Sequence, residues 1–160
     1  VSVLVGQRLG AGDADAAERV TFSAIHLAAV FFIFAGIMLV AMPEYFIKPF
    51  SSGMSLKTYK VTAPLVEDLL GMVALFCLFE ALSMMMGGAL KGAGDTRFVA
   101  ITTILCSWLV LVLPTAVLVL FWDGNLHWCW SFFVLNGLVM FVLHWLRFRS
   151  AKWKNLRIVA

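Results

Sequence analysis

Four long apolar stretches, each almost free of charge, dominate the chain. Each approaches the roughly 20 apolar residues that an α-helix needs to cross the hydrocarbon core of a membrane. The pattern therefore predicts spanning helices over about residues 20–42, 66–90, 98–121 and 128–146. The fold class that follows is an all-α, polytopic membrane helix bundle.

The composition supports a membrane location. Of the 160 residues, 62% are hydrophobic and 13% are charged, and the mean hydropathy is +0.97. Soluble domains are roughly half apolar and about a quarter charged, so a water-soluble fold of this size could not hide so much apolar surface. Residues 1–10 read as the last turns of a further, fifth helix, and the chain does not begin with Met. We therefore expect residues 1–160 to be part of a longer polypeptide.

Basic residues divide unequally between the two sides of the membrane. Nine of the twelve Lys and Arg residues fall on one side, and three fall on the other. The nine are Arg8, Arg19, Lys91, Arg97, Arg147, Arg149, Lys152, Lys154 and Arg157; the three are Lys48, Lys57 and Lys60. Because cytoplasmic loops carry the excess of Lys and Arg, loops 8–19 and 91–97 and the tail 147–160 are predicted to be cytoplasmic, in a multi-pass protein of the cell (inner) membrane. The net charge of +3 is then a topology signal, and we expect membrane lipid, and no nucleic acid, as a partner.

The first predicted cytoplasmic loop combines Gly with Asp. Gly10 and Gly12 are expected to end one helix by adopting positive φ. Asp13 or Asp15 is expected to cap the next helix. The sequence therefore predicts a tight helix–loop–helix.

The second loop repeats this chemistry between the second and third spans. Gly92 and Gly94 are expected to allow the turn, and Asp95 or Thr96 to cap the helix that follows. A Gly-x-Gly turn also occurs in phosphate-binding loops, but here no strand precedes it and no Gly-Lys-Ser/Thr follows. A structural turn is the favoured interpretation.

Residues 43–65 form the longest polar connection. Prolines, among them Pro64, are expected to break it up, with a short interfacial helix near residues 55–62. Glu67 and Asp68 are then expected at the start of the second span, where acids suit a helix N-terminus.

Pro114 lies inside the third predicted span. A proline there removes one backbone donor and clashes with the preceding turn, so we expect a kink. Bent helices line the transport path in many transporters, but a kink is also tolerated for packing alone. The sequence leaves both interpretations open.

Glu80 stands near the middle of the second span, with no opposite charge within four residues. An intramembrane acid costs about 2.5–3.5 kcal/mol on insertion scales and marks a functional site by default. Such a group either stays protonated or finds a cation, so we predict that Glu80 exchanges H⁺ or Na⁺ against a cationic substrate and is the tentative Na⁺ ligand. Ser83, on the same helix face, could add a second oxygen ligand. The alternative is a protonated, purely structural acid bonded to a neighbouring helix.

Three other polar residues within the spans are expected to be structural. His26 and His144 lie nearer a membrane boundary, where an imidazole can reach headgroups or a carbonyl oxygen. Asn136 is expected to form an interhelical hydrogen bond.

The two loops resemble recurrent loops of the multidrug and toxic compound extrusion (MATE) transporters. Val5-Gly6-Gln7-Arg-Leu-Gly-Ala-Gly-Asp13 is similar to the loop after the second helix of a lobe, and Gly88-Ala-Leu-Lys-Gly-Ala-Gly-Asp-Thr-Arg97 to the loop between the fourth and fifth. Two spans separate the loops, as in that family. The basic tail favours the C-terminal lobe, so the resemblance implies helices nine to twelve and an N-terminal lobe of the same polypeptide as partner.

The resemblance also implies a role for Glu80. The cation site of that lobe includes an acid on helix ten, ten residues before the Leu of the turn, and Leu90 places that acid at Glu80. Pro114 corresponds to the bend of helix eleven. The implied function is an Na⁺- or H⁺-coupled antiporter that exports small cationic or amphipathic compounds by alternating access, without a cofactor beyond the coupling ion.

Three alternatives remain. A lipid-linked oligosaccharide flippase of the same superfamily would need basic residues in its cavity, which the predicted spans lack. A membrane enzyme would need clustered acids or His, and Glu67 with Asp68 lacks a third partner, so we expect no enzyme. In a non-catalytic membrane assembly subunit, Glu80 would serve stability alone.

Overall fold

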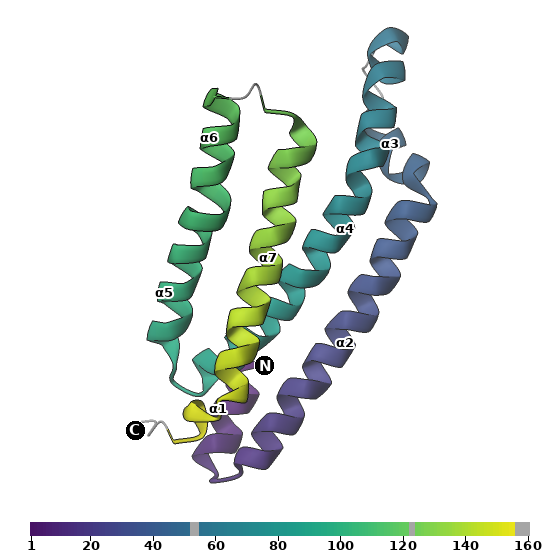
Figure 1. Ribbon diagram of the computed structural model, residues 1–160. Coiled ribbons are helices and arrows are strands. Elements are labelled where there is room, and N and C mark those ends of the chain that lie inside the picture. The colour runs from purple at the N-terminus through teal and green to yellow at the C-terminus, as the bar shows by residue number, and fades with distance from the viewer. Residues whose placement is uncertain (52–54, 122–123, 156–160) are drawn as a thin grey trace.

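The computed structural model describes residues 1–51, 55–121 and 124–155, and the elements in those ranges are helices (Figure 1). They are α1 (Ser2–Gly10), α2 (Ala14–Ala41), α3 (Pro43–Ser51), α4 (Leu56–Gly92), α5 (Thr96–Cys106), the π-helical η1 (Ser107–Val112), α6 (Leu113–Phe121), α7 (Leu126–Arg149) and the 3₁₀ turn η2 (Lys152–Asn155). Four helical segments are long and apolar enough to cross a membrane. The predicted helix bundle with four such segments is confirmed.

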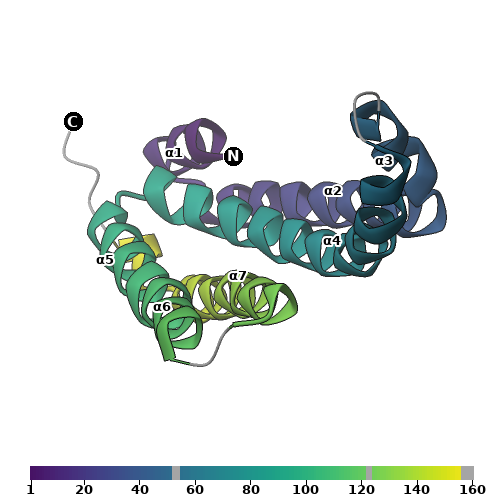
Figure 2. The same cartoon turned by 90° about the horizontal axis from the view of Figure 1, so that it is seen from above.

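Helix α4 occupies the middle of the bundle. It packs against α2 on one side and α7 on the other, and the continuous α5–η1–α6 segment packs against α7 (Figures 1 and 2). The short α1 crosses α2 and α4 at one end. Both Gly-Asp loops and η2 lie at this same end, which we call the basic end. The arrangement leaves much of each long helix facing outward.

Each spanning helix begins earlier than predicted. Helix α2 begins at Ala14, because the Asp13 carboxylate accepts a hydrogen bond from the Ala16 N–H at 2.8 Å and so caps the helix. Helix α7 begins at Leu126, where the Asn125 side chain accepts from the His127 N–H, and continues to Arg149. Of the two predicted caps, Asp13 is therefore correct and Asp15 lies within the first turn.

The predicted break at Pro64 is wrong. Helix α4 begins at Leu56, with Ser55 as its N-cap, and runs through Pro64 without interruption. Proline removes one N–H donor, and the exposed position of Pro64 and Lys60 lets solvent reach the carbonyl left without a partner. The interfacial helix expected near residues 55–62 is therefore the first part of α4, and Glu67 and Asp68 lie inside this helix rather than at its start. Of the connection, residues 52–54 lie outside the described ranges.

The two Gly-Asp loops fold identically. In the first, the Gly12 N–H donates to the Leu9 carbonyl and the Asp13 N–H to the Arg8 carbonyl. In the second, the Gly94 N–H donates to Lys91 and the Asp95 N–H to Leu90. This pair of bonds is the Schellman motif, which satisfies the last carbonyls of a helix.

Only the second glycine of each loop needs positive φ. Gly12 has φ of 78° and Gly94 has φ of 89°, values that L side chains adopt rarely. The expectation that Gly10 would also adopt positive φ is wrong, because Gly10 is the last residue of α1, just as Gly92 is the last residue of α4.

The backbone hydrogen bonding of the third spanning segment changes just before Pro114. The π-helical residues Ser107–Val112 separate α5 from α6, and Pro114 is the second residue of α6. A π-helical segment shifts the bonding pattern from i→i+4 to i→i+5, which accommodates the missing N–H of Pro114. A π-helical segment thus precedes Pro114, and the kink predicted at Pro114 stays a prediction.

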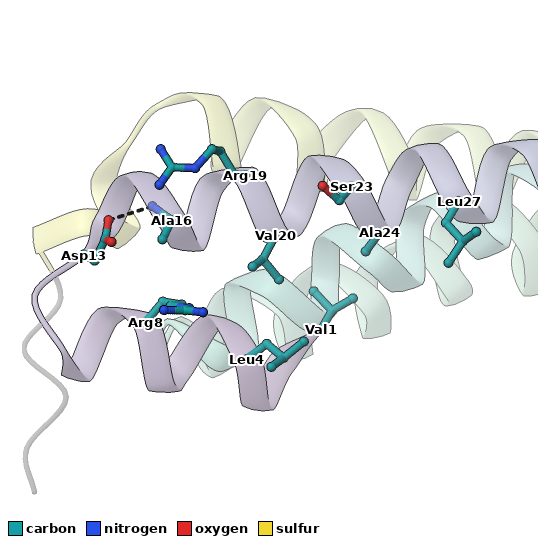
Figure 3. Close-up of a pocket in the computed structure, with 10 residues that line it drawn as sticks. All are labelled: Val1, Leu4, Arg8, Asp13, Ala16, Arg19, Val20, Ser23, Ala24 and Leu27. Atoms are coloured by element: carbon teal, nitrogen blue, oxygen red, sulfur yellow. Dashed lines mark hydrogen bonds between the residues drawn. The ribbon is translucent and has the colours of Figure 1, made fainter.

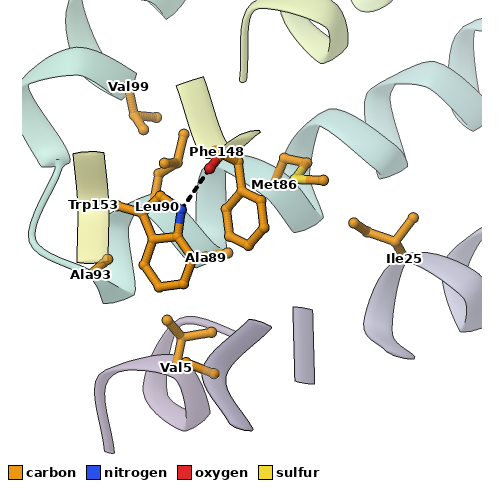
Figure 4. Close-up of a cluster of buried hydrophobic side chains, with 10 residues drawn as sticks. Val5, Ile25, Met86, Ala89, Leu90, Ala93, Val99, Phe148 and Trp153 are labelled. Atoms are coloured by element: carbon orange, nitrogen blue, oxygen red, sulfur yellow. Dashed lines mark hydrogen bonds between the residues drawn. The ribbon is translucent and has the colours of Figure 1, made fainter. Parts of the chain in front are cut away.

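The buried core is concentrated at the basic end (Figure 4). Val5 from α1, Ala17 from α2, and Met86, Ala89 and Leu90 from α4 pack there with α7. Trp153 closes this cluster: its ring stacks on Phe148 with centroids 4.7 Å apart, and its Nε1–H donates to the Phe148 carbonyl at 2.7 Å. The cluster fixes the positions of both Gly-Asp loops and the chain after α7.

Large apolar side chains point outward along the rest of the bundle. Leu27, Phe34 and Leu120 are 74%, 64% and 75% exposed. A water-soluble protein rarely leaves so many large apolar groups on its surface. Lipid is the environment in which this surface is stable.

Candidate functional site

Glu80 lies about two-thirds of the way along α4, more than three turns before the helix ends at Gly92, and is half-buried. Within the described ranges its carboxylate forms no hydrogen bond and no ion pair. An acid at membrane depth is costly unless a proton or a cation neutralises it. Glu80 is therefore an acid inside a spanning helix without a neutralising partner among the described residues.

A stripe of α4 residues beside Glu80 faces α7. Phe76, one turn earlier, makes edge-to-face contacts with Trp130 and Phe133 of α7. Ser83, one turn later, contacts His144 of the same helix. Since positions three and four apart share one helix face, Glu80 occupies the α7-facing side, as its predicted register required.

Gly137 of α7 lies at the level of Glu80. A Cβ atom added to Gly137 would be 3.3 Å from the Phe79 Cβ and 3.5 Å from the Glu80 backbone nitrogen. The missing side chain thus allows α7 to approach α4 closely at this point, which is how small residues act at helix contacts in membranes. Gly137 therefore sets the spacing of the two helices beside Glu80.

Asn136, next to Gly137, carries a second polar group at this depth. Its side-chain oxygen Oδ1 is buried and has no hydrogen-bond partner in the described part of the chain. The interhelical hydrogen bond expected for Asn136 is therefore not formed through Oδ1. A buried amide oxygen without a partner is uncommon and requires an explanation, and carbonyl oxygens are ligands for hard cations.

Ser83 and His144 form a buried polar pair between α4 and α7. Ser83 is 1% exposed and His144 is 2% exposed, and Ser83 Oγ lies within hydrogen-bonding distance, 3.1 Å, of His144 Nδ1. Gly87 lies against the imidazole: an added Cβ would be 3.4 Å from its Cε1 atom. The other ring nitrogen, Nε2, is buried without a partner among the described residues.

The contact with Ser83 agrees with the structural role expected for His144, but the partner is neither a headgroup nor a carbonyl oxygen. Helix α7 continues to Arg149, more than a turn beyond His144, and Gly87 opens a space on α4 into which the imidazole fits. The pairing cannot be predicted from local sequence, because Ser83 lies 61 positions before His144. The available signal was a small residue, Gly87, one turn from Ser83 on the face of α4 that also carries Glu80.

No group of three or more His, Cys, Asp or Glu side chains suited to a metal ion occurs within the described residues. Glu80 as an Na⁺ ligand, with Ser83 beside it, therefore stays a prediction. Its ligand set would consist of oxygens other than clustered carboxylates.

The motif residues lie where α1 crosses the end of α4. A Cβ atom on Gly92 would clash with the Ser2 carbonyl oxygen, and a Cβ on Gly6 would lie 3.2 Å from the Gly92 carbonyl oxygen. Gln7 and Arg97 are exposed. Gly6 and Gly92 therefore act through close backbone approach, which the sequence did not reveal.

Asp95 connects the second loop to α7. It holds the N-cap position of α5, as predicted, but its side chain forms no capping hydrogen bond there. Instead, Arg147 Nε donates to Asp95 Oδ2 at 2.7 Å, and the guanidinium lies 5.0 Å from the centroid of the Phe98 ring. The second Gly-Asp loop is thus connected to α7 by a charged hydrogen bond that is largely shielded from water.

Comparison with known proteins agrees with these features. The family model MatE matches residues 1–118. The chain belongs to this family, the MATE transporters. A probable multidrug resistance protein NorM of Rhodopseudomonas palustris is 35% identical over 68% of the chain and 23% of its own length. A NorM protein of Thermotoga maritima is 25% identical over 99% of the chain and 33% of its own length.

A human relative carries a similar name. Multidrug and toxin extrusion protein 1 of Homo sapiens is 28% identical over 75% of the chain and 20% of its own length. This MATE chain thus spans between about a fifth and a third of the length of these relatives. No solved structure gave a significant match.

Proposed function

We propose that this chain is part of a cation-coupled antiporter that exports organic cations or drugs by alternating access. Glu80 is the group at which Na⁺ or H⁺ binds. The observation that carries the proposal is the position of Glu80: half-buried well inside α4, on the side that faces α7, without a partner in the described part of the chain. Relatives named for multidrug resistance and for toxin extrusion support an export function.

The surroundings of Glu80 suit a small cation. Gly137 lies against the Glu80 backbone, and the preceding residue of α7, Asn136, has a buried oxygen without a partner among the described residues. If the Ser83 hydroxyl donates to His144, its oxygen keeps lone pairs for a cation. A change in the spacing of α4 and α7 would then alter the affinity for the ion, which is the coupling that alternating access requires.

We also propose that the basic end faces the cytoplasm. Both Gly-Asp loops and η2 lie there, and Lys and Arg are enriched in cytoplasmic loops. The substrate cleft would form against further helices of the same polypeptide, the expected N-terminal lobe.

The test is Glu80→Gln in the complete polypeptide, reconstituted into vesicles with Na⁺ and pH gradients imposed separately. Gln keeps the shape and removes the charge, so ion-driven export of a cationic dye should be lost. Glu67→Gln, an exposed acid on the same helix, is the matched control and should leave export unchanged. Unchanged ion-driven export in Glu80→Gln would refute the coupling role, and a loss of folding or assembly alone would favour the assembly-subunit alternative.

A further inference from the structure

A hollow of about 620 Å³ lies between α1 and α2 at the basic end (Figure 3). Arg8 from α1 and Arg19 from α2 line its polar part, with Ser23 beside them. Val20, Ala24 and Leu27 continue the lining along α2. The hollow therefore joins a cationic part to an apolar part.

Both arginines lack an acidic partner in the described ranges, although three acids are near. Asp13 also lines the hollow, but its carboxylate caps α2 through the Ala16 N–H. Asp15 and Glu18 are engaged by Lys154, whose Nζ lies 3.8 Å and 2.6 Å from their carboxylates. The hydrogen bond to Glu18 raises the pKa of Lys154, as expected for a stable charged pair. The guanidinium groups of Arg8 and Arg19 are thus left to bind an anion from outside.

The apolar part runs in the direction of the membrane. Val20, Ala24 and Leu27 follow each other at helical spacing on one face of α2, and Leu27 is 74% exposed. From Arg19 to Leu27 the helix rises about 12 Å at 1.5 Å per residue. A phosphate bound by the arginines at headgroup level would therefore place an acyl chain against these three residues.

We propose that this hollow binds one anionic phospholipid, with its phosphate between Arg8 and Arg19 and an acyl chain along Val20, Ala24 and Leu27. Basic pockets at the ends of spanning helices suit anionic headgroups, and a soluble phosphate would leave the apolar part of the hollow unused. The proposal requires that α2 spans the membrane, and it is independent of ion coupling at Glu80. The bound lipid would hold the α1–α2 hairpin at the membrane surface.

The test measures lipid binding to the complete polypeptide, purified in detergent and freed of lipid. Phosphatidylglycerol, phosphatidylcholine and glycerol 3-phosphate are titrated separately, and bound molecules are counted by native mass spectrometry. We expect preferential binding of phosphatidylglycerol. The double variant Arg8→Gln/Arg19→Gln should weaken that binding by about 30-fold, because each arginine is expected to raise the affinity for an anionic headgroup by about fivefold.

A matched control removes the same charge elsewhere. Arg149 and Lys152 are exposed at the same end, and Arg149→Gln/Lys152→Gln should leave phosphatidylglycerol binding within about twofold. Ala24→Trp, which keeps both arginines and fills the apolar part, should weaken lipid binding while the protein remains monodisperse. If the double variant does not fold, Ala24→Trp and the single variant Arg19→Gln decide the question.

Three results would overturn the proposal. Equal losses of phosphatidylglycerol binding in the two double variants would indicate that the lipid is attracted to the whole basic end rather than bound at one site. Competition by glycerol 3-phosphate as strong as that by phosphatidylglycerol would indicate a soluble anion as the ligand. Unchanged binding in Ala24→Trp would exclude the acyl-chain position.

Discussion

Gly6 and Gly92 meet where α1 crosses the end of α4, and a Cβ atom on Gly6 would lie 3.2 Å from the Gly92 carbonyl oxygen. Gly92 opens the second Gly-Ala-Gly-Asp loop, and Gly6 lies in α1, one turn before the first. The glycines of these two segments therefore have two structural roles: Gly12 and Gly94 form the Schellman turns, and Gly6 and Gly92 let α1 and α4 touch. This crossing adjoins the buried cluster around Leu90 and Trp153.

Gly92→Ala should destabilise the protein by about 1–3 kcal/mol, the usual cost of overpacking. The new Cβ would meet the Ser2 carbonyl oxygen, and a backbone atom cannot move away as a flexible side chain can. Gly10→Ala is the matched control, because its Cβ would meet nothing within 4 Å and Ala favours helix by up to about 1 kcal/mol. Thermal unfolding of the complete polypeptide in detergent measures both, and similar losses in the two variants would contradict the close approach.

The hydrogen bond between Asp95 and Arg147 should contribute measurable coupling. A double-mutant cycle with Asp95→Asn and Arg147→Gln is expected to give an interaction free energy of about 0.5–3 kcal/mol, because the Asp95 side chain is only 9% exposed. The same cycle on Asp15 and Lys154, 3.8 Å apart with Asp15 82% exposed, should give less than about 1 kcal/mol. Added salt should reduce the coupling between Asp15 and Lys154 more than the coupling between Asp95 and Arg147, because exposed charges are screened more strongly. Equal coupling in both pairs would show that burial of Asp95 has no influence.

Much of the fold follows from local sequence, and the exceptions have physical causes. Long apolar runs predict the four spanning helices, and Asp13 is predictable as a cap because its carboxylate serves its own next turn. Pro64 does not end its helix as predicted, because the loss of a single N–H is tolerated where the helix is long and the position is exposed. The Glu80 register follows from helical periodicity. Ser83 with His144 could not be predicted, since no local pattern specifies which residues of two helices meet.

Ser83→Ala should lower the free energy of unfolding by about 1–3 kcal/mol, because it leaves His144 Nδ1 buried without its partner. Ser131→Ala is the control: that hydroxyl donates only to the His127 carbonyl of its own helix, so a change within about 0.5 kcal/mol is expected. Replacing both members, as in Ser83→Ala/His144→Leu, should be less destabilising than the sum of the single changes. Additive losses would show that the two side chains do not act as a pair.

Gly137→Val should reduce ion-driven export on the order of tenfold to a hundredfold, as ångström-scale displacement of a functional group does in other active sites. The added side chain would press on Phe79 and on the Glu80 backbone, and so widen the spacing between α7 and the acid. Gly71→Val introduces the same side chain on α4 where a Cβ meets nothing within 4 Å, and export should be retained. Unfolding in detergent, measured in parallel, separates displacement of Glu80 from loss of the fold. Normal export in Gly137→Val, with both variants folded, would mean that the α4–α7 spacing beside Glu80 does not control coupling.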